Sequence, residues 1–333
     1  MHTHINGKTA SRIYRDVCDA YGVGRIYSMT HLADAPAVRE VFGDRLRFIA
    51  VPNFADLDGG RAFREGYLEA IEGFHALGSR IVKFWCAPRS IDLGREMGDP
   101  TLLRLDNEWR VRCMELAHSL GMMFMTHIAD PDTWFKGKYS DASVYGTKEQ
   151  QYEQLEWALD TYSDTPWIAA HMGGWPENLE FLTDLLSRHD NLNLDTSATK
   201  WMVRELSKHS RGEMLEFLER FSGRILFGSD IVTTDQHLGD EHADRGMGHL
   251  ASSEEEAFEL YASRYWALRS LWETEYHDES NIADPDLMML EPDEYDAMSA
   301  PFLRGHSLPR DVLRVLYRDA ASGVIDKWHD EHP

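Results

Sequence analysis

Basic residues are scarce in this sequence. Its 333 residues include 34 lysines and arginines against 57 aspartates and glutamates, which gives a formal net charge of −23. A nucleic-acid-binding protein needs a basic face to neutralise phosphates, so this balance argues against such a partner. The hydrophobic content of 43% and the aromatic content of 11% exclude a disordered chain and supply a large core.

Cysteines and long apolar runs are also few. The three cysteines, Cys18, Cys86 and Cys113, are not closely spaced. They provide neither a disulfide framework nor a thiolate metal site, and they favour a reducing compartment. No stretch approaches 18 uninterrupted apolar residues, and the N-terminus has neither a basic region nor an apolar signal core. We therefore expect a cytoplasmic protein without a membrane span.

The sequence alternates short apolar runs with longer amphipathic stretches and has no Pro/Gly/Ser-rich linker. The length fits one α/β barrel of roughly 250 residues with insertions, or two domains of about 150 residues each. Eight runs have the composition of strands: Met1 to Ile5, Arg25 to Met29, Arg47 to Val51, Arg80 to Trp85, Met122 to His127, Trp167 to His171, Asn191 to Asp195 and Arg224 to Ser229. Helices are predicted between them, at Ala10 to Tyr21, Arg61 to Leu77, Asn107 to Leu120, Glu149 to Thr161, Asn178 to Ser187 and Met202 to Phe221.

This strand count predicts an α/β protein with a (β/α)8 TIM-barrel fold. A doubly wound open sheet more often has five to seven strands and a glycine-rich first turn, which this sequence lacks. We expect a single domain over residues 1–333, in which residues 233–307 form an insertion over the barrel mouth, as a lid or an interface. Leu308 to Ile325 is predicted to be a closing helix outside the barrel.

The predicted insertion has three parts. Residues 233–253 are polar and charged, so His237, His242 and His249 are expected to be solvated. Glu254 to His277 is predicted to be a long aromatic-rich helix, in which the helical spacing of Tyr261, Tyr265, Leu268 and Trp272 favours core packing over an exposed interface. Residues 278–301 are acidic and irregular.

Polar side chains stand at the predicted strand ends, which converge at one rim of a barrel. They are His2, His4, Lys83, His127, His171, Asp195 and Asp230. Period-two alternation places His2 and His4 on one face of the first strand, where both can reach a single ion. Imidazoles with a carboxylate suit zinc and other first-row ions and leave a position open for water or substrate. The pattern therefore predicts a catalytic metal site.

The first strand has almost no residues ahead of His2, although its neighbours run to five or six residues. This raises the expectation of a start codon assigned too late or of a trimmed chain.

Four short motifs carry a family resemblance. They are His2-Thr3-His4, Thr126-His127-Ile128-Ala129-Asp130, Ala170-His171-Met172-Gly173-Gly174 and Gly228-Ser229-Asp230. With them, the sequence resembles the amidohydrolase superfamily, in its amidohydrolase-related branch, which includes aminocarboxymuconate semialdehyde decarboxylase, resorcylate decarboxylase and lactone or amide hydrolases. The resemblance covers the chain from His2 to about Ile231 and the closing helix, but not the insertion.

The resemblance implies a ligand set of His2, His4, His127 and Asp230 for one divalent ion, with zinc preferred to manganese. Asp230 would also act in catalysis. His171 would be an acid/base beside the metal, or a ligand of a second ion if Lys83 is a carboxylated bridge. The form of the motif around His171 favours a single ion.

The function that follows is a metal-dependent hydrolase of a small amide, lactone or ester, with a nonoxidative decarboxylase of an aromatic or enoic acid as the alternative on the same scaffold. A barrel that binds metal without catalysis is a third possibility, which the intact ligand set disfavours. Lys83, Trp85 and Lys200 are candidate substrate-binding residues, and cations beside aromatic faces suit an anionic or ring-containing small molecule. Barrels of this branch are often homodimers.

Overall fold

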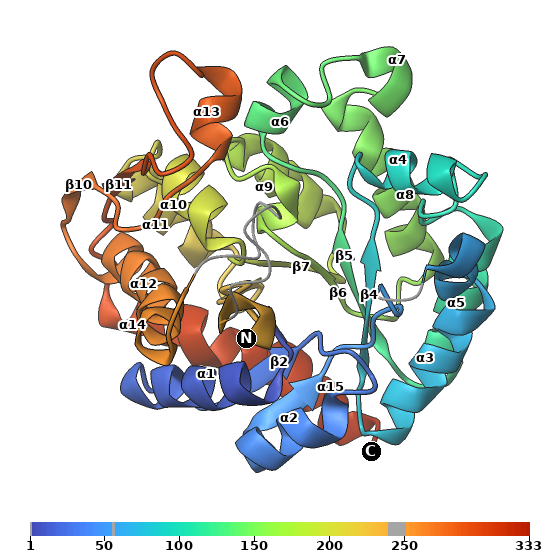
Figure 1. Ribbon diagram of the computed structural model, residues 1–333. Coiled ribbons are helices and arrows are strands. Elements are labelled where there is room, and N and C mark those ends of the chain that lie inside the picture. Colours follow the sequence, from blue (N-terminus) through green and yellow to red (C-terminus); the bar gives the residue numbers. More distant parts are fainter. Residues whose placement is uncertain (1, 55–56, 239–250) are drawn as a thin grey trace.

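The computed structural model describes residues 2–54, 57–238 and 251–333 and shows a ring of helices around a barrel of parallel strands (Figure 1). The strands of the barrel are β1 (His2–Ile5), β2 (Ile26–Ser28), β3 (Leu46–Phe48), β4 (Ile81–Trp85), β5 (Met123–His127), β6 (Trp167–Ala169), β7 (Leu192–Asp195), β8 (Ile225–Leu226) and β9 (Val232–Thr233). The predicted TIM barrel is confirmed, and each of the eight predicted strands overlaps an observed one, although β3 begins one residue before the predicted run from Arg47 to Val51.

Two seams close the barrel. The strands are ordered β3-β2-β1-β9 in one sheet and β4-β5-β6-β7-β8 in the other. Ala50, just after β3, forms a parallel bridge with Val82 of β4 and so joins the sheets on one side. On the other side, the backbone amides of His4 and Asp230 donate to the carbonyls of Ile231 and His2, respectively, at 2.9 Å each. The eighth strand is thus two short pieces, β8 and β9, that flank Asp230.

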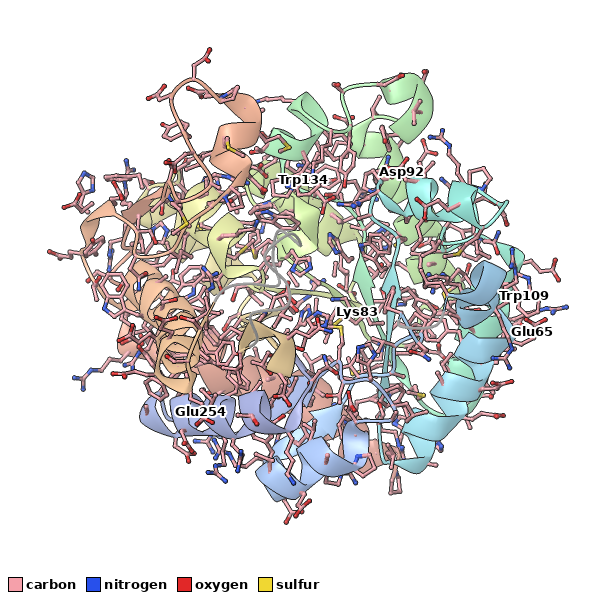
Figure 2. All side chains as sticks on the ribbon, in the orientation of Figure 1. Glu65, Lys83, Asp92, Trp109, Trp134 and Glu254 are labelled. Carbon is pink, nitrogen blue, oxygen red and sulfur yellow. The ribbon has the colours of Figure 1, made fainter. Side chains whose placement is uncertain are left out.

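Side chains alternate between the inside of the barrel and the helical layer, as the pleat of a strand requires. On β4, Lys83 and Trp85 line a central cavity, whereas Phe84 contacts Tyr67 of a surrounding helix with ring centroids 5.8 Å apart. Figure 2 shows Lys83 near the middle of the molecule and Glu65, Trp109 and Glu254 toward its periphery. This alternation is what turns strand-end polar residues toward a common space.

The surrounding helices include α1 (Lys8–Ala20), α2 (Ala35–Phe42), α3 (Glu65–Ala76), α4 (Ser90–Glu96), α5 (Glu108–Ser119), α6 (Asp132–Lys136), α7 (Ala142–Tyr145), α8 (Lys148–Thr161), α9 (Leu179–Arg188), α10 (Thr199–Leu206) and α11 (Arg211–Arg220). Short helical turns are η1 (Gly43–Arg45), η2 (Asp58–Phe63), η3 (Met172–Gly174) and η4 (Asp235–Leu238). Among the described ranges, none of the helices combines the length and apolar character that a membrane crossing needs.

The single helix predicted from Met202 to Phe221 is wrong, because the chain forms α10 and α11 there instead. Ser210 begins α11 with a capping box, in which its hydroxyl accepts from the amide of Glu213 and the Glu213 carboxylate accepts from the amide of Ser210. This pairing satisfies amides that a helix start would otherwise leave without partners. The helix α10 begins soon after β7, beside the rim of the barrel, and ends before this cap.

The described part of the segment after β9 forms part of the barrel wall. Its elements are α12 (Glu254–Glu273), β10 (His277–Glu279), α13 (Asp286–Leu290) and β11 (Phe302–Arg304), and β10 pairs antiparallel with β11. The helix α12 ends at Glu273, so the predicted continuation to His277 is wrong: His277 belongs to the β10–β11 hairpin. Because α12 packs against α1 and α10, it fills the place between these two helices in the ring.

Residues of α12 follow the predicted helical spacing. Tyr261, Tyr265, Leu268 and Trp272 are all buried, which confirms core packing. The closing helix is also confirmed. It runs through α14 (Arg310–Arg314), η6 (Val315–Asp319), η7 (Ser322–Asp326) and α15 (Lys327–Glu331). Its buried side chains include Leu316, Ala320 and Ile325.

Candidate metal centre and active site

A cavity of about 970 Å³ opens at the carboxyl ends of the strands. Residues from β1, β4, β5, β9, α10 and α12 line it, together with the loops that follow β2, β6 and β8. Among its described lining residues, Asp230 is the one carboxylate, and the cations are Lys83, Lys200 and Arg264. The cavity is therefore locally positive in a chain whose net charge is −23.

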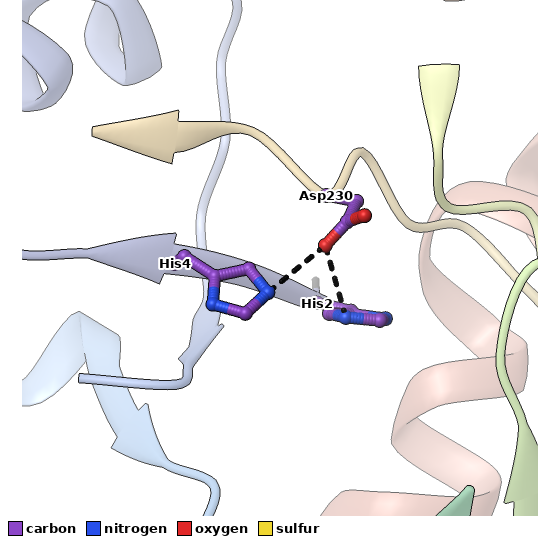
Figure 3. Close-up of side chains that lie close together, drawn as sticks. All are labelled: His2, His4 and Asp230. Carbon is purple, nitrogen blue, oxygen red and sulfur yellow. Dashed lines mark ion pairs between the residues drawn. The ribbon is translucent and has the colours of Figure 1, made fainter. Parts of the chain in front are cut away.

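Three side-chain atoms converge on one point at the floor of this cavity (Figure 3). Oδ1 of Asp230 lies 3.3 Å from Nε2 of His2 and 3.2 Å from Nε2 of His4. This oxygen is buried and forms no hydrogen bond with another described residue. Within the described ranges, these three residues form the one group able to hold a metal ion. Three converging lone-pair donors, one of them an unpartnered buried oxygen, fit a divalent cation.

The charged state of Asp230 is favoured by the same neighbours. Burial by itself raises the pKa of Asp230, but the imidazoles of His2 and His4 outweigh this effect and hold its pKa well below the ordinary value. For His4, burial lowers the pKa, so the neutral imidazole with a free lone pair predominates. An ionised carboxylate and neutral imidazoles are the protonation states that bind metal ions.

Asp195, at the end of β7, orients two histidines of the site. Its Oδ2 accepts from Nδ1 of His2 at 2.7 Å, and its Oδ1 accepts from the backbone amides of His171 and Ser197 at 2.9 and 3.0 Å. Burial would raise the pKa of Asp195, but the adjacent His2 holds it well below its usual range. Because Nδ1 of His2 donates to Asp195, Nε2 carries the lone pair, and Nζ of Lys83 lies 2.9 Å from it.

His171 is held by a hydrogen-bond chain that ends on the same carboxylate. The Ser197 hydroxyl donates to Oδ1 of Asp195, so it has a lone pair left to accept from Nδ1 of His171, which is 2.8 Å away. This assigns the proton of neutral His171 to Nδ1 and the lone pair to Nε2. Burial lowers the pKa of His171 well below its ordinary value, and His127 lowers it further. His171 is thus a neutral base in the resting site.

The turn that presents His171 has an unusual backbone. His171 and Met172 have φ values of 60° and 51°, and Asp230 has a φ of 55°; non-glycine residues adopt this left-handed region rarely and at a cost. Gly174 has a φ of 78°, and a Cβ placed there would lie 2.1 Å from the carbonyl oxygen of Ala129. Glycine is therefore required where the His171 turn passes the end of β5.

His127, predicted as the fourth ligand, lines the cavity but lies outside the three-residue group. Its Nε2 donates to Oδ1 of Asp130 at 2.7 Å, and its ring centroid is 4.4 Å from that of His171. With Nε2 occupied by Asp130, Nδ1 carries its lone pair. The role of His127 as a ligand stays a prediction.

The predicted substrate-binding residues all line the cavity, in different states. Lys83 is buried with Nζ 2.9 Å from Nε2 of His2, and burial lowers its pKa. Lys200 faces two carboxylates, with Nζ 3.8 Å from Asp284 and 3.5 Å from Asp286. Trp85 is in register with His127 across β4 and β5. Lys83 therefore lies against the candidate metal ligand His2, whereas Lys200 lies beside the carboxylates of Asp284 and Asp286.

The expectation that His237 is solvated is wrong. It is buried, lines the cavity, and its Nδ1 lies 3.0 Å from the hydroxyl of Tyr261 on α12, because the packing of η4 under α12 removes it from solvent. His242 and His249 lie outside the described residues.

Sequence reasoning missed Ser197, Arg264 and the orienting role of Asp195. Ser197 had no signal of its own, because its function depends on contacts with residues far away in sequence. Arg264 did have one: it lies three residues after Tyr261 and four before Leu268, on the face of α12 that the apolar spacing marks as buried. A cation on such a face needs an explanation.

Comparison with known proteins gives one family match. The amidohydrolase family model matches residues 8–261, a range that begins after His2 and His4. No curated protein matches the sequence.

Solved structures give distant similarities. The chain is similar to a probable 2-pyrone-4,6-dicarboxylic acid hydrolase from Acinetobacter baumannii with citric acid bound, at 13% identity over 80% of this chain and 91% of that one, with a TM-score of 0.46. An uncharacterised TIM-barrel protein from Bordetella bronchiseptica is 15% identical over 65% and 68%, with a TM-score of 0.45. A 2,6-dihydroxybenzoate decarboxylase in complex with 2,6-dihydroxybenzoate is 14% identical over 65% and 76%, with a TM-score of 0.41.

Proposed function

The chain belongs to the amidohydrolase family, whose model matches residues 8–261, and on this premise we propose that it is a metal-dependent hydrolase of a small amide, lactone or ester. The observation that carries this proposal is the buried Oδ1 of Asp230, which forms no hydrogen bond with a described residue and lies beside Nε2 of His2 and Nε2 of His4. A barrel with no catalytic role has no need of such a donor set at the carboxyl ends of its strands.

The residues that would hold the ion are His2, His4 and Asp230, with His127 as the fourth. Two imidazoles and a carboxylate suit zinc, with manganese as the alternative. When bound, a divalent ion supplies water activation, lowering the pKa of water from 15.7 to about 7, and Lewis-acid polarisation of a carbonyl. The carboxylates of Asp195 and Asp130 would fix the orientation of His2 and His127, as outer hydrogen-bond partners of metal-binding histidines do.

Proton transfer falls to Asp230 and His171. The Asp230 carboxylate is ionised because its pKa lies well below the ordinary value, so the oxygen that does not face His2 and His4 can accept a hydrogen bond from the attacking water and orient it. His171 presents Nε2 with Nδ1–H anchored on Ser197, so it can take up a proton and pass it to the leaving group without turning its ring. Positioned groups of this kind contribute typically 10²- to 10⁴-fold to the rate.

A single ion is the arrangement we favour. Only one three-donor group exists within the described ranges, and His171, the other strand-end histidine, has Nδ1 committed to Ser197. The alternative with two ions would need Lys83 as a carboxylated bridge and Nε2 of His171 as a ligand. Buried Lys83, with its lowered pKa, lies close enough to His2 to keep this alternative open to test.

A decarboxylase on the same scaffold is the second candidate. It is favoured by the locally positive cavity, in which Lys83, Lys200 and Arg264 accompany a single carboxylate among the described lining residues. Such a cavity suits an anionic, ring-containing acid. Product analysis separates the two reactions: ring opening or acyl cleavage supports the hydrolase, and release of carbon dioxide from an aromatic or enoic acid supports the decarboxylase.

Metal content per chain tests the proposal directly. We expect about one equivalent of zinc or manganese in the purified protein by elemental analysis, and its loss in His4→Ala and Asp230→Ala. His118→Ala is the matched control. His118 is exposed, does not line the cavity, and pairs with Asp164 at a distance of 3.2 Å. Two equivalents would move the assignment to a binuclear centre. No retained metal, even after reconstitution with zinc or manganese, would overturn the proposed function.

A further inference from the structure

The three cations that line the cavity differ in how their charge is balanced. Lys83 lies against His2 at the ligand set, and Lys200 faces Asp284 and Asp286. Arg264, on α12, forms no hydrogen bond and no ion pair with the described residues. The charge of Asp284 acts on it and raises its pKa, but the two side chains form no ion pair.

Asp284 is already engaged by other cations. It is fully buried, it accepts a hydrogen bond from Arg204, and Lys200 lies 3.8 Å away. The other carboxylates beside it are also paired: Glu205 forms ion pairs with Arg204 and Lys208, and Asp286 forms ion pairs with Lys200 and Arg204. Each of these carboxylates therefore already has a cation other than Arg264.

Arg264 does not have the setting of a solvated surface arginine. It is partly buried between Tyr261 and Leu268 along α12, both of which are buried. Burial lowers its pKa, which means that the surroundings penalise the charge they enclose. A partly buried guanidinium without a partner among the described residues carries part of this desolvation cost, and an anionic ligand in the cavity would offset it.

We propose that Arg264 binds a carboxylate of the substrate, so that the substrate carries an anionic group separate from the bond that reacts at His2, His4 and Asp230. This inference rests on the proposed function, because it assigns that site its substrate class. Guanidinium is planar and presents paired N–H donors that match a carboxylate, so Arg264 would orient the substrate as well as attract it. The preferred substrates would then be acids rather than neutral lactones, amides or esters.

Binding of the three benzenedicarboxylates to the zinc-loaded full chain, measured by isothermal titration calorimetry, tests this inference. Each isomer is compared with its monomethyl ester, which keeps one carboxylate for the ligand set and removes the other. We expect at least one isomer to bind about 10- to 100-fold more tightly than its ester, the range for hydrogen bonds to a charged group. The isomer with the largest affinity ratio of diacid to ester would also indicate the distance between Arg264 and the ligand set.

The variants are Arg264→Gln, Arg264→Lys and Arg269→Gln. Arg264→Gln should abolish the advantage of the diacid over the ester, and Arg264→Lys should keep part of it. Arg269 lies on the same helix but is exposed and paired with Glu273 at 2.6 Å, so Arg269→Gln should retain the full ratio. Circular dichroism and thermal midpoints verify that each variant is folded. An unchanged ratio in Arg264→Gln, or no advantage in the unaltered protein, overturns the inference.

Zinc content of the same samples keeps this inference separate from the proposed function. One equivalent of zinc without any preference for the diacid removes the role of Arg264 and leaves the metal centre standing. A chain that retains no zinc overturns the proposed function. If that protein still prefers the diacid in an Arg264-dependent way, the carboxylate site at Arg264 is supported. If it shows no such preference, both the proposed function and the role of Arg264 are overturned.

Discussion

Asp195 accepts a hydrogen bond from Nδ1 of His2 at 2.7 Å, and both side chains are fully buried. The two residues lie at the ends of β7 and β1, 193 positions apart in sequence. Their contact fixes the tautomer of His2 and turns Nε2 toward Asp230. Asp195 also accepts a hydrogen bond from the Ser197 hydroxyl, which in turn accepts one from Nδ1 of His171. A single carboxylate therefore positions a candidate metal ligand and an acid/base group.

Replacement of this carboxylate should weaken metal binding without removing a ligand. We expect Asp195→Asn to lower zinc affinity by about 10- to 100-fold, the effect of losing an outer partner of a metal-binding histidine. Competition with a chromophoric chelator measures the affinity. Asp164→Asn, at an exposed aspartate paired with His118, is the control. Equal zinc affinity in Asp195→Asn and the unaltered protein would contradict the orienting role.

His171 should be dispensable for metal binding and essential for turnover. In His171→Gln we expect one equivalent of metal to remain while kcat falls by about 10²- to 10⁴-fold, because the group that moves the proton is lost. Elemental analysis and steady-state kinetics on an identified substrate measure the two effects. A drop from two equivalents to one would instead identify His171 as a ligand of a second ion.

Asp286 joins the segment after β10 to the cavity wall. Its Oδ2 accepts from Nε1 of Trp134 and from Nε1 of Trp201, each at 2.8 Å. The Trp201 ring stands 5.6 Å from that of His171. We expect Asp286→Asn to lower the free energy of unfolding by about 1–3 kcal/mol and to raise KM, since two indoles lose a charged acceptor.

Urea unfolding, tryptophan emission and steady-state kinetics check this prediction. Asp296→Asn, at an exposed position of the same segment, is the control. If Asp286→Asn left stability, emission and KM all unchanged, the two tryptophans would not depend on Asp286.

His306 should make folding sensitive to acid. Burial lowers its pKa to about 4, and its Nε2 hydrogen-bonds the carbonyl of Leu206 at 3.2 Å. Below about pH 6.5 His306 binds a proton in the unfolded chain, but in the folded chain it stays neutral until about pH 4. The free energy of unfolding therefore falls as the pH drops through this window. At pH 5 the loss is roughly 2 kcal/mol.

His306→Asn should therefore lose less stability between pH 7 and pH 5 than the unaltered protein, because the other titrating groups cancel in the comparison. Urea unfolding at both pH values measures the difference, and His118→Asn, at an exposed histidine, should behave like the unaltered protein. The same pH dependence in His306→Asn would show that His306 does not carry the effect.

The barrel could be predicted because its signals are local. Apolar runs such as Met122 to His127 mark strands by composition alone, and eight of them in alternation with helical stretches imply closure. Boundaries were less predictable: the run from Arg224 to Ser229 became a two-residue strand, β8, because the chain leaves the sheet to present Asp230 in a left-handed conformation. The break before α11 depended on Ser210, a single cap inside an otherwise continuous helical pattern.

The site was predictable where a motif coincided with a strand end. His2, His4 and Asp230 converge as expected, because parallel strands deliver their carboxyl ends to one rim. The balance of charge could not be read in the same way. Lys200 and Arg264 are both cations of helices beside the cavity. Only the packing of residues 284–286 shows that Lys200 faces two carboxylates, whereas Arg264 forms no ion pair within the described part of the chain.

The sequence by itself determined the strand count and which residue types stand at strand ends, since both follow from local hydrophobic periodicity and the pleat. Tertiary structure alone decided which polar groups neutralise one another. The contacts of Asp195 with His2 and of Asp286 with Trp134 and Trp201 join residues far apart in sequence. Hydrogen bonds and ion pairs act over a few ångströms, so spacing along the chain cannot reveal them until the barrel has closed.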